Sequence, residues 1–160
     1  MELPHWTHRH NGKLVDVVDI PTEAIGFIYI IRFTDNTYYI GKKLVRTREM
    51  KPALLNGKPR DNHIRFLSKI KKRKKVPYEE LHKELNFASY IGSFDKSQYE
   101  NNDVKSREIL SFHSTKKGLS YHETKALFEY DVLMKDDFRN KNIGGTMFRK
   151  DIESVKYAEE

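Results

Sequence analysis

The stretch Phe27-Ile-Tyr-Ile-Ile-Arg-Phe33 is rich in β-branched and aromatic residues, a composition that favours a β-strand. Asp35-Asn36 follows, and both residues tolerate left-handed backbone and can hydrogen-bond their own main chain, as turn residues do. A second strand-like run, Thr37-Tyr-Tyr-Ile40, comes next, and Gly41 permits a sharp exit from it. The segment therefore predicts a β-hairpin, and the other elements are expected to pack around it.

The chain that follows the hairpin is dominated by charge as far as residue 77, and six of the seven residues from Lys69 to Lys75 are basic. After Pro77, the leucine spacing and the acidic first turn of Tyr78 to Phe87 predict a helix. Val104 to Phe112 has the apolar content of a third strand.

A second helix is predicted after this strand. Ser120-Tyr-His-Glu123 has the pattern of a capping box, with Ser120 as the N-cap and Glu123 three residues later. Apolar residues continue on one side of the segment through Met134, and Asp136-Asp137 is expected to end the helix.

These elements predict an α+β fold, with a small antiparallel or mixed three-stranded sheet flanked by helices. Residues 1–24 are expected to form an N-terminal arm, residues 25–145 one domain, and residues 146–160 a C-terminal tail. Within the arm, the alternation from Leu14 to Ile20 predicts a strand or an extended segment packed on the body.

Composition limits the classes of function. The chain has 160 residues, enough for one domain with its own core, and no cysteine, which excludes disulfides, thiolate zinc sites and a cysteine nucleophile. Thirty basic against 23 acidic residues give a formal charge of +7, which attracts polyanions or serves only to keep the surface solvated. The longest apolar run, Gly26 to Ile31, is too short to span a membrane, and the N-terminus has no signal-peptide core. A soluble, cytoplasmic protein is expected.

The hairpin also carries a resemblance. Gly26-Phe-Ile-Tyr29 precedes Tyr39-Ile-Gly41, with the two tyrosines ten positions apart, and this pair resembles the motif of the GIY-YIG nucleases. In that family both tyrosines face a shared site beside the scissile phosphate, which implies that Tyr29 and Tyr39 are catalytic. Phe27 stands where the family usually has glycine. A second copy of the tripeptide, Tyr90-Ile-Gly92, has no matching strand before it and is interpreted as a turn or packing site.

The resemblance implies further site residues. Lys42 or Lys43 is expected beside the phosphate, Lys42 as a nucleic-acid contact and Lys43 as a catalytic group. The family also has an arginine about ten residues after the second tyrosine, on its first helix. Arg48 is nearest to that position and Arg46 is next. A late asparagine corresponds to Asn140 or Asn142.

The resemblance also implies a metal-binding glutamate on a helix, and Mg²⁺ (or Mn²⁺) as the cofactor. Glu123 is the first candidate and Glu129 the second. They are six residues apart, a rotation of about 600°, so they are expected to face different directions. His122 could assist this site, whereas His5, His8 and His10 are interpreted as surface residues.

The reaction implied by the resemblance is hydrolysis of DNA phosphodiester bonds by a metal-dependent endonuclease. Compact members of this kind are found in bacteriophages, which would place the protein in the cytoplasm of a bacterial host. The expected partner is double-stranded DNA, without a membrane, and a homodimer would allow both strands to be cut. The basic run supplies the other expected nucleic-acid contacts: Lys69, Lys71, Lys72, Arg73, Lys74 and Lys75.

Two alternatives remain open at the level of sequence. One is a catalytically inactive domain of the same fold that binds nucleic acid through the basic run. The other is an interaction protein without a nucleic-acid role, whose charge only maintains solubility.

Overall fold

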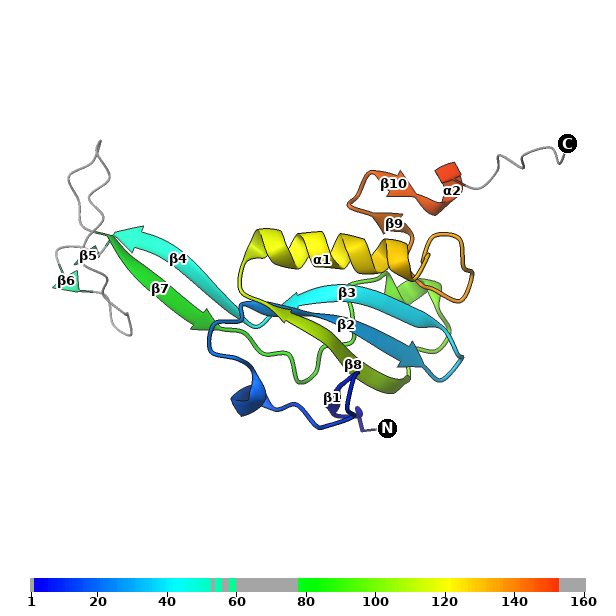
Figure 1. Ribbon diagram of the computed structural model, residues 1–160, viewed down its shortest axis with the longest axis horizontal. Coiled ribbons are helices and arrows are strands. Elements are labelled where there is room, and N and C mark those ends of the chain that lie inside the picture. The colour runs from blue at the N-terminus through cyan, green and yellow to red at the C-terminus, as the bar shows by residue number, and fades with distance from the viewer. Residues whose placement is uncertain (1, 53, 56–57, 60–77, 153–160) are drawn as a thin grey trace, which may run out of the picture.

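The computed structural model describes residues 2–52, 54–55, 58–59 and 78–152, with side chains for 2–47 and 84–152 (Figure 1). Its main sheet has four strands in the order β1-β8-β2-β3, in which β1 is parallel to β8 and the other pairs are antiparallel. The strands of this sheet are β1 (Trp6–His8), β8 (Val104–His113), β2 (Gly26–Phe33) and β3 (Tyr38–Leu44). The α+β class is confirmed, but the sheet has four strands rather than three because β1, from the predicted arm, joins it.

The predicted hairpin is confirmed as β2 and β3. Its turn contains Asn36 with a positive φ of 64°, a conformation that asparagine tolerates. The carboxylate of Asp35 accepts hydrogen bonds from the Thr37 backbone N–H (3.0 Å) and from the Thr37 hydroxyl (2.6 Å). The turn residues therefore stabilise the bend by the local hydrogen bonds that their side chains favour.

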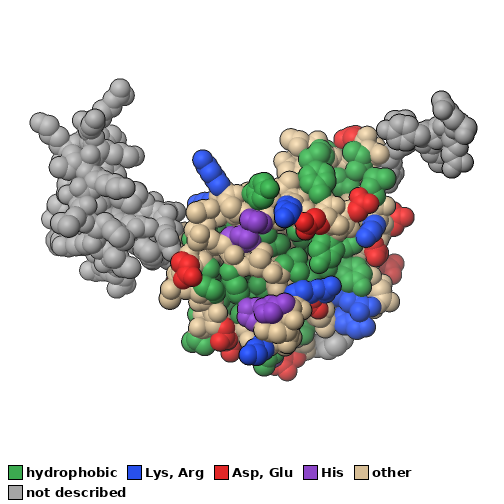
Figure 2. Space-filling view, viewed as in Figure 1, with side chains coloured by type: hydrophobic (Ala, Val, Ile, Leu, Met, Phe, Trp, Pro, Cys, Tyr) green, Lys and Arg blue, Asp and Glu red, His purple; other side chains and the backbone are tan. Residues whose placement is uncertain are grey.

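The two faces of the sheet bury different cores. Phe27, Tyr29 and Ile31 pack with Trp6 on one face. Residues of the opposite parity in β2 pack against α1 (Lys116–Glu129), which lies across the other face of the sheet (Figure 1). On the side viewed in Figure 2, apolar side chains are visible over the sheet, with charged side chains around them.

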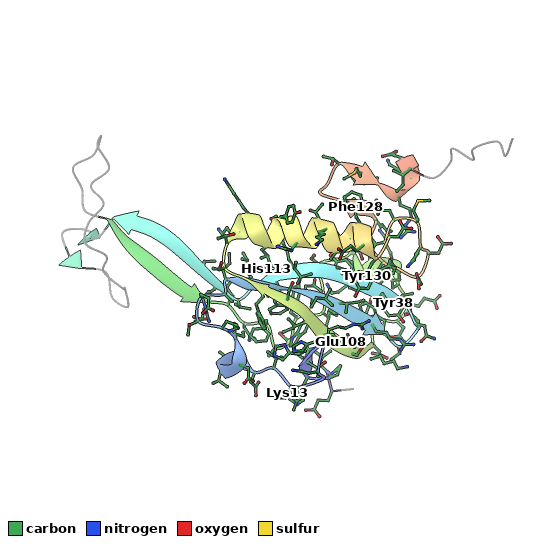
Figure 3. The ribbon with its side chains drawn as sticks, viewed as in Figure 1. Lys13, Tyr38, Glu108, His113, Phe128 and Tyr130 are labelled. Carbon is green, nitrogen blue, oxygen red and sulfur yellow. The ribbon has the colours of Figure 1, made fainter. Side chains whose placement is uncertain are left out.

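Gly26 allows α1 to approach the sheet closely. A Cβ at this position would lie 2.8 Å from Cδ2 of Leu119 and 2.5 Å from the carbonyl oxygen of Lys43. Tyr38 and Tyr130, labelled in Figure 3, lie on this same α1 side, both packed against the core that contains Phe138. Tyr39 packs against the core on the other face, so the two neighbouring tyrosines face away from each other.

The boundaries of α1 differ from those predicted. The N-cap is Thr115, whose side chain accepts a hydrogen bond from the Gly118 N–H at 2.9 Å, so Ser120 lies inside the helix and is not its cap. The helix ends at Glu129 rather than near Met134, because Asp131 adopts a left-handed conformation with φ 54°. Beyond it, Val132 and Leu133 still pack on the core from a turn, whereas Met134 is exposed.

The segment predicted as a helix after Pro77 is instead a strand. β7 (Tyr78–Glu84) pairs antiparallel with β4 (Arg46–Pro52), and this ribbon extends away from the main sheet (Figure 1). Backbone pairing with a strand distant in sequence outweighs the local leucine spacing. β5 (Leu54–Leu55) pairs with β6 (Lys58–Pro59), and the basic run of 69–75 lies outside the described residues.

The remaining elements are short. The segment from Leu14 to Ile20 contains a 3₁₀ turn, Val17–Asp19, where a strand or an extended segment was predicted, and a second 3₁₀ turn spans Lys96–Gln98. Near the C-terminal end lie β9 (Asn142–Ile143), β10 (Met147–Phe148) and α2 (Arg149–Ile152). Among the described residues, the helices are too short or too polar to cross a membrane.

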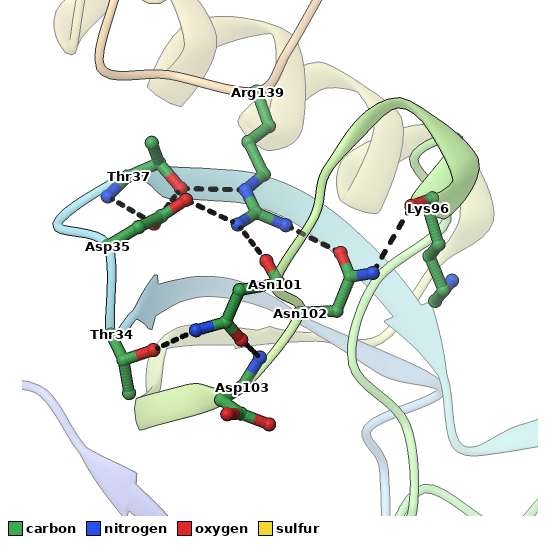
Figure 4. Close-up of polar contacts among 8 residues, drawn as sticks. All are labelled: Thr34, Asp35, Thr37, Lys96, Asn101, Asn102, Asp103 and Arg139. Carbon is green, nitrogen blue, oxygen red and sulfur yellow. Dashed lines mark hydrogen bonds and ion pairs between the residues drawn. The ribbon is translucent and has the colours of Figure 1, made fainter.

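A buried arginine ties the hairpin turn to two distant segments (Figure 4). The side chain of Arg139 is 0% exposed and donates to the Thr37 hydroxyl (2.7 Å), to a carboxylate oxygen of Asp35 (3.0 Å) and to the amide oxygen of Asn102 (2.8 Å). Its guanidinium carbon also lies 3.6 Å from the ring centroid of Phe33. These contacts hold the outer end of the hairpin in place.

We expect Arg139→Met to lower the free energy of unfolding by about 3 kcal/mol, because the polar groups around Arg139 lose a charged donor. Arg9→Met is the matched control. Arg9 also pairs with a carboxylate, that of Glu108 at 2.6 Å, but its side chain is 51% exposed, so the loss should stay below about 1 kcal/mol. Urea unfolding followed by circular dichroism measures both, and equal losses would contradict the anchoring role of Arg139.

Candidate functional site

A cavity of about 620 Å³ opens along β3, at the edge of the main sheet. Tyr39 and Lys42 of β3 line it, and they point to opposite faces of the sheet because side chains alternate along a strand. The cavity therefore wraps around the edge strand. Other lining residues come from the loop before β8, from α1 and from the segment after it, among them Ser93, Asp95, Ser120, Glu123, Thr124, Leu127, Asn140, Lys141 and Asn142.

The two motif tyrosines lie together on one face of the sheet, with ring centroids 6.2 Å apart. Tyr29 is fully buried, whereas Tyr39 lines the cavity. Gly41 is the register partner of Tyr29, and a Cβ on it would lie 2.5 Å from the Tyr29 hydroxyl oxygen. The glycine of the Tyr39-Ile-Gly41 tripeptide therefore leaves the space through which the Tyr29 ring crosses β3.

Burial keeps both phenols protonated at neutral pH. It raises the pKa of Tyr29 well above the usual value, and the neighbouring Tyr90 and Tyr39 raise that pKa further. Burial also raises the pKa of Tyr39, while a hydrogen bond between its hydroxyl and the Ser93 hydroxyl, at 2.9 Å, acts in the opposite direction. At neutral pH each tyrosine therefore has a hydrogen to donate.

An ion pair occupies the α1 side of the cavity. Nζ of Lys42 lies 2.9 Å from Oε2 of Glu123 and 3.0 Å from the Ser120 hydroxyl oxygen. Glu123 belongs to the cavity-lining stripe of α1, spaced as Ser120, Glu123, Thr124 and Leu127. Glu129 lies off this stripe: it is 60% exposed and pairs with Lys125 at 3.6 Å. Of the two predicted glutamates, only Glu123 lies at the cavity.

The predicted arginines do not lie on a helix. Arg46 and Arg48 are in strand β4, and the side chain of Arg48 lies outside the described residues. The guanidinium of Arg46 donates to the carbonyl oxygens of Pro21 and Thr22, and it is not among the groups that line the cavity. Because β4 pairs with β7, the first helix on which the family arginine was expected is replaced by a ribbon in this chain.

Of the remaining candidates, Asn140 and Asn142 line the cavity and His122 does not. Asn140 is buried, and its side chain bonds both the N–H (3.1 Å) and the carbonyl (2.7 Å) of Ile40 in the edge strand. Asn142 lines the cavity and caps a turn through the Gly145 N–H at 3.0 Å. His122 stacks on His113 with centroids 4.4 Å apart, and neither ring lines the cavity.

Lys43 points to the face opposite Lys42. Its Nζ lies 4.7 Å from the ring centroid of Tyr90, the tyrosine of the second tripeptide. Tyr90 and Ser93 contact the hydroxyls of the two motif tyrosines, and neither was predicted as a site residue. The recurrence of Tyr-Ile-Gly is the available sequence signal, but the tripeptide alone predicts only a turn or packing site.

The donor set of the cavity fits a hard divalent cation. Among the described residues there is no group of three or more histidine, cysteine, aspartate or glutamate side chains that could hold a metal. A cation here would therefore have the Glu123 carboxylate and take its other oxygen ligands from water and a substrate phosphate. Mg²⁺ is commonly bound in this way, by one or two carboxylates with several waters retained.

A protein-family model described as "Putative endonuclease segE, GIY-YIG domain" matches residues 6–143. No curated protein matches the chain, and no solved structure matches it. The match begins at the first residue of β1 and ends at the last residue of β9, so it covers the whole main sheet, α1 and the cavity lining except Gly144 and Gly145.

We expect Gly41→Ala to lower the free energy of unfolding by about 2 kcal/mol, because the new methyl group overlaps the Tyr29 hydroxyl and forces the ring to move. The effect should be smaller when Tyr29→Phe has already removed that oxygen. A double-mutant cycle from urea unfolding measures the coupling. Strictly additive losses would show that the two residues are not in contact as described.

Proposed function

The chain belongs to the GIY-YIG endonuclease family, and from that premise we propose that it is a metal-dependent endonuclease that hydrolyses phosphodiester bonds of double-stranded DNA. The observation that carries the proposal is the convergence of Tyr39, Lys42 and Glu123 on one cavity at the edge of β3. A phenol, an ammonium and a carboxylate provide a group to orient water, a cation for a phosphate and a ligand for a metal.

The charge of the site supports a polyanionic substrate. Lys42 and Lys141 line the cavity, and the chain as a whole carries a formal charge of +7. A phosphate bound by Lys42 would replace the contacts that its ammonium group makes with Glu123 and Ser120. In the proposed reaction, these lysines supply the positive charge that an arginine supplies elsewhere in the family.

In the proposed reaction the substrate competes for Lys42. A phosphate oxygen that binds Nζ of Lys42 draws it from Glu123, and the released carboxylate is then available to hold Mg²⁺ or Mn²⁺. Bound there, the metal would supply charge stabilisation at the leaving oxygen. The Tyr39 oxygen orients the attacking water, and in its phenolate form it accepts the water's proton as the phosphorus–oxygen bond forms.

One observation favours the alternative of an inactive nucleic-acid-binding domain. Lys42 already neutralises Glu123, and Arg46 is bound to backbone carbonyls outside the cavity. An ion pair that persisted with substrate bound would give binding without cleavage. The same assay separates the two functions.

The test is nicking of supercoiled plasmid at low salt, with Mg²⁺ and with EDTA. We expect nicking only with the metal, and about 100-fold slower nicking by Tyr39→Phe and by Glu123→Gln. Glu129→Gln is the matched control, because it makes the same change on the same helix away from the cavity, and it should nick at the wild-type rate. Plasmid binding by the wild type without nicking would support the inactive alternative, and cleavage of duplex RNA alone would correct the substrate.

The dependence of the nicking rate on pH tests the role of Tyr39. Because burial raises the pKa of its phenol, the phenolate fraction increases about tenfold for each pH unit between pH 7 and 9. The nicking rate should rise in parallel, with no plateau below pH 9, if the Tyr39 oxygen accepts the proton from water. The residual rate of Tyr39→Phe should stay flat over this range, and a wild-type plateau near pH 7 would assign the proton transfer to another group.

A further inference from the structure

The second tripeptide, Tyr90-Ile-Gly92, lies directly against the tyrosines of the first. The hydroxyl of Tyr29 donates to the hydroxyl oxygen of Tyr90 at 3.1 Å. The two rings are perpendicular, with an interplanar angle of 88° and centroids 5.6 Å apart. Tyr29 is fully buried and does not line the cavity, so its hydroxyl depends on Tyr90 for a hydrogen-bond partner.

The other end of the same loop contacts Tyr39. Gly92 has a φ of 108°, and a Cβ on it would lie 2.9 Å from Cδ1 of Tyr39, so the loop backbone rests on that ring. The Ser93 hydroxyl then meets the Tyr39 hydroxyl at 2.9 Å. The loop therefore makes one hydrogen bond with each motif tyrosine, through Tyr90 to Tyr29 and through Ser93 to Tyr39.

The loop is held rigidly enough to orient these hydroxyls. Arg107 is 4% exposed, and its guanidinium donates to the carbonyl oxygens of Ala88 (2.6 Å) and Tyr90 (3.1 Å). The indole N–H of Trp6 donates to the carbonyl of Phe87 at 3.1 Å. The backbone on the N-terminal side of the loop is thus fixed from β8 and from β1.

We propose that Ser93 and Tyr90 are positioning residues of the nuclease site: Ser93 donates its hydroxyl hydrogen to the Tyr39 oxygen, and Tyr90 accepts the hydrogen of Tyr29. The inference rests on the proposed function, because it assigns the two contacts a part in the same reaction. When Ser93 donates, its hydrogen bond occupies one lone pair of the Tyr39 oxygen. The O–H of the neutral Tyr39 phenol then points toward the cavity, where water would bind. A hydrogen bond donated by serine also stabilises the phenolate, the form of Tyr39 that can take up a proton from water.

Other charged and titratable groups around Tyr39 stay unchanged when Ser93 is substituted. They come from every element that packs around the cavity: Tyr29 of β2, Lys42 of β3, Tyr90, Asp95 and Tyr99 from the segment before β8, Glu123 of α1, and Arg139 and Lys141 beyond it. A change in the behaviour of Tyr39 in the Ser93→Ala variant therefore reports the loss of the hydrogen bond between the Ser93 and Tyr39 hydroxyls. Ser93 is exposed, so its substitution should leave the fold intact.

The direct test does not need activity. With tyrosine labelled by ¹³C at Cζ, each phenol gives one NMR signal, and the signals of Tyr39 and Tyr29 are assigned by their loss in Tyr39→Phe and Tyr29→Phe. At pH 7.5, Ser93→Ala should shift the Tyr39 signal only, and Ser93→Thr, which keeps the hydroxyl, should restore it. Tyr90→Phe should shift the Tyr29 signal only. Unchanged signals, or shifts of both in each variant, would overturn the proposal.

The kinetic test uses the full chain in the nicking assay. Ser93→Ala should lower kcat about tenfold at pH 7.5 with KM changed less than twofold, since loss of the hydrogen bond raises the pKa of the Tyr39 phenol and lowers the fraction of phenolate. At about one pH unit above 7.5, the nicking rate of Ser93→Ala should reach the rate that the wild type has at pH 7.5. Ser93→Thr should behave as wild type. Ser89→Ala is the matched control, a serine of the same loop outside the cavity, and should have no effect.

The two tests separate failure of the inference from failure of the proposed function. NMR shifts as expected in a protein that nicks no substrate would overturn the proposed function, and the positioning role with it. Active wild-type protein with unaltered kinetics in Ser93→Ala would overturn the positioning role alone.

Discussion

The pairing of Tyr29 with Gly41 across β2 and β3 is the contact on which the site depends. The Tyr29 ring needs the space above a residue without a side chain, and this requirement fixes the register of the hairpin. The register then places Tyr39 on the same face and Lys42 on the opposite one. A slip of one residue would exchange the faces of every side chain on β3 and separate the tyrosines.

The second constraint is the edge of the sheet. An edge strand exposes unpaired backbone groups, which proteins generally cover or interrupt. Here the Asn140 side chain bonds the N–H and the carbonyl of Ile40, at the middle of the edge, while the buried Arg139 fixes the turn at one end. The segment after α1 therefore covers the edge of β3 at these two points. The same segment also lines the cavity beside them.

The sequence predicted elements whose signals are local. The hairpin and β8 are encoded by composition and turn residues within their own lengths. β1 and the β4–β7 ribbon depend on partners far away in the chain, and their local patterns were misleading or silent. The same reason left Glu123 and Glu129 unresolved: which of them faces the cavity depends on how α1 packs. Tyr90 was missed because a tripeptide gives no indication of what it packs against.

The site keeps the ion pair of Lys42 and Glu123 on one side of β3 and the hydroxyls of Tyr39 and Ser93 on the other. In the proposed reaction this division couples two binding events. Lys42 and Glu123 neutralise each other, so a phosphate that takes Lys42 leaves an unpaired carboxylate, and a cation that takes Glu123 leaves an unpaired ammonium. Phosphate binding removes Lys42, which competes with the metal for Glu123, and metal binding removes Glu123, which competes with the phosphate for Lys42. Thermodynamic linkage requires the two effects to be reciprocal. Metal and nucleic acid would therefore bind more tightly together than either does alone, while the tyrosines, which carry no charge at neutral pH, remain in place for the water.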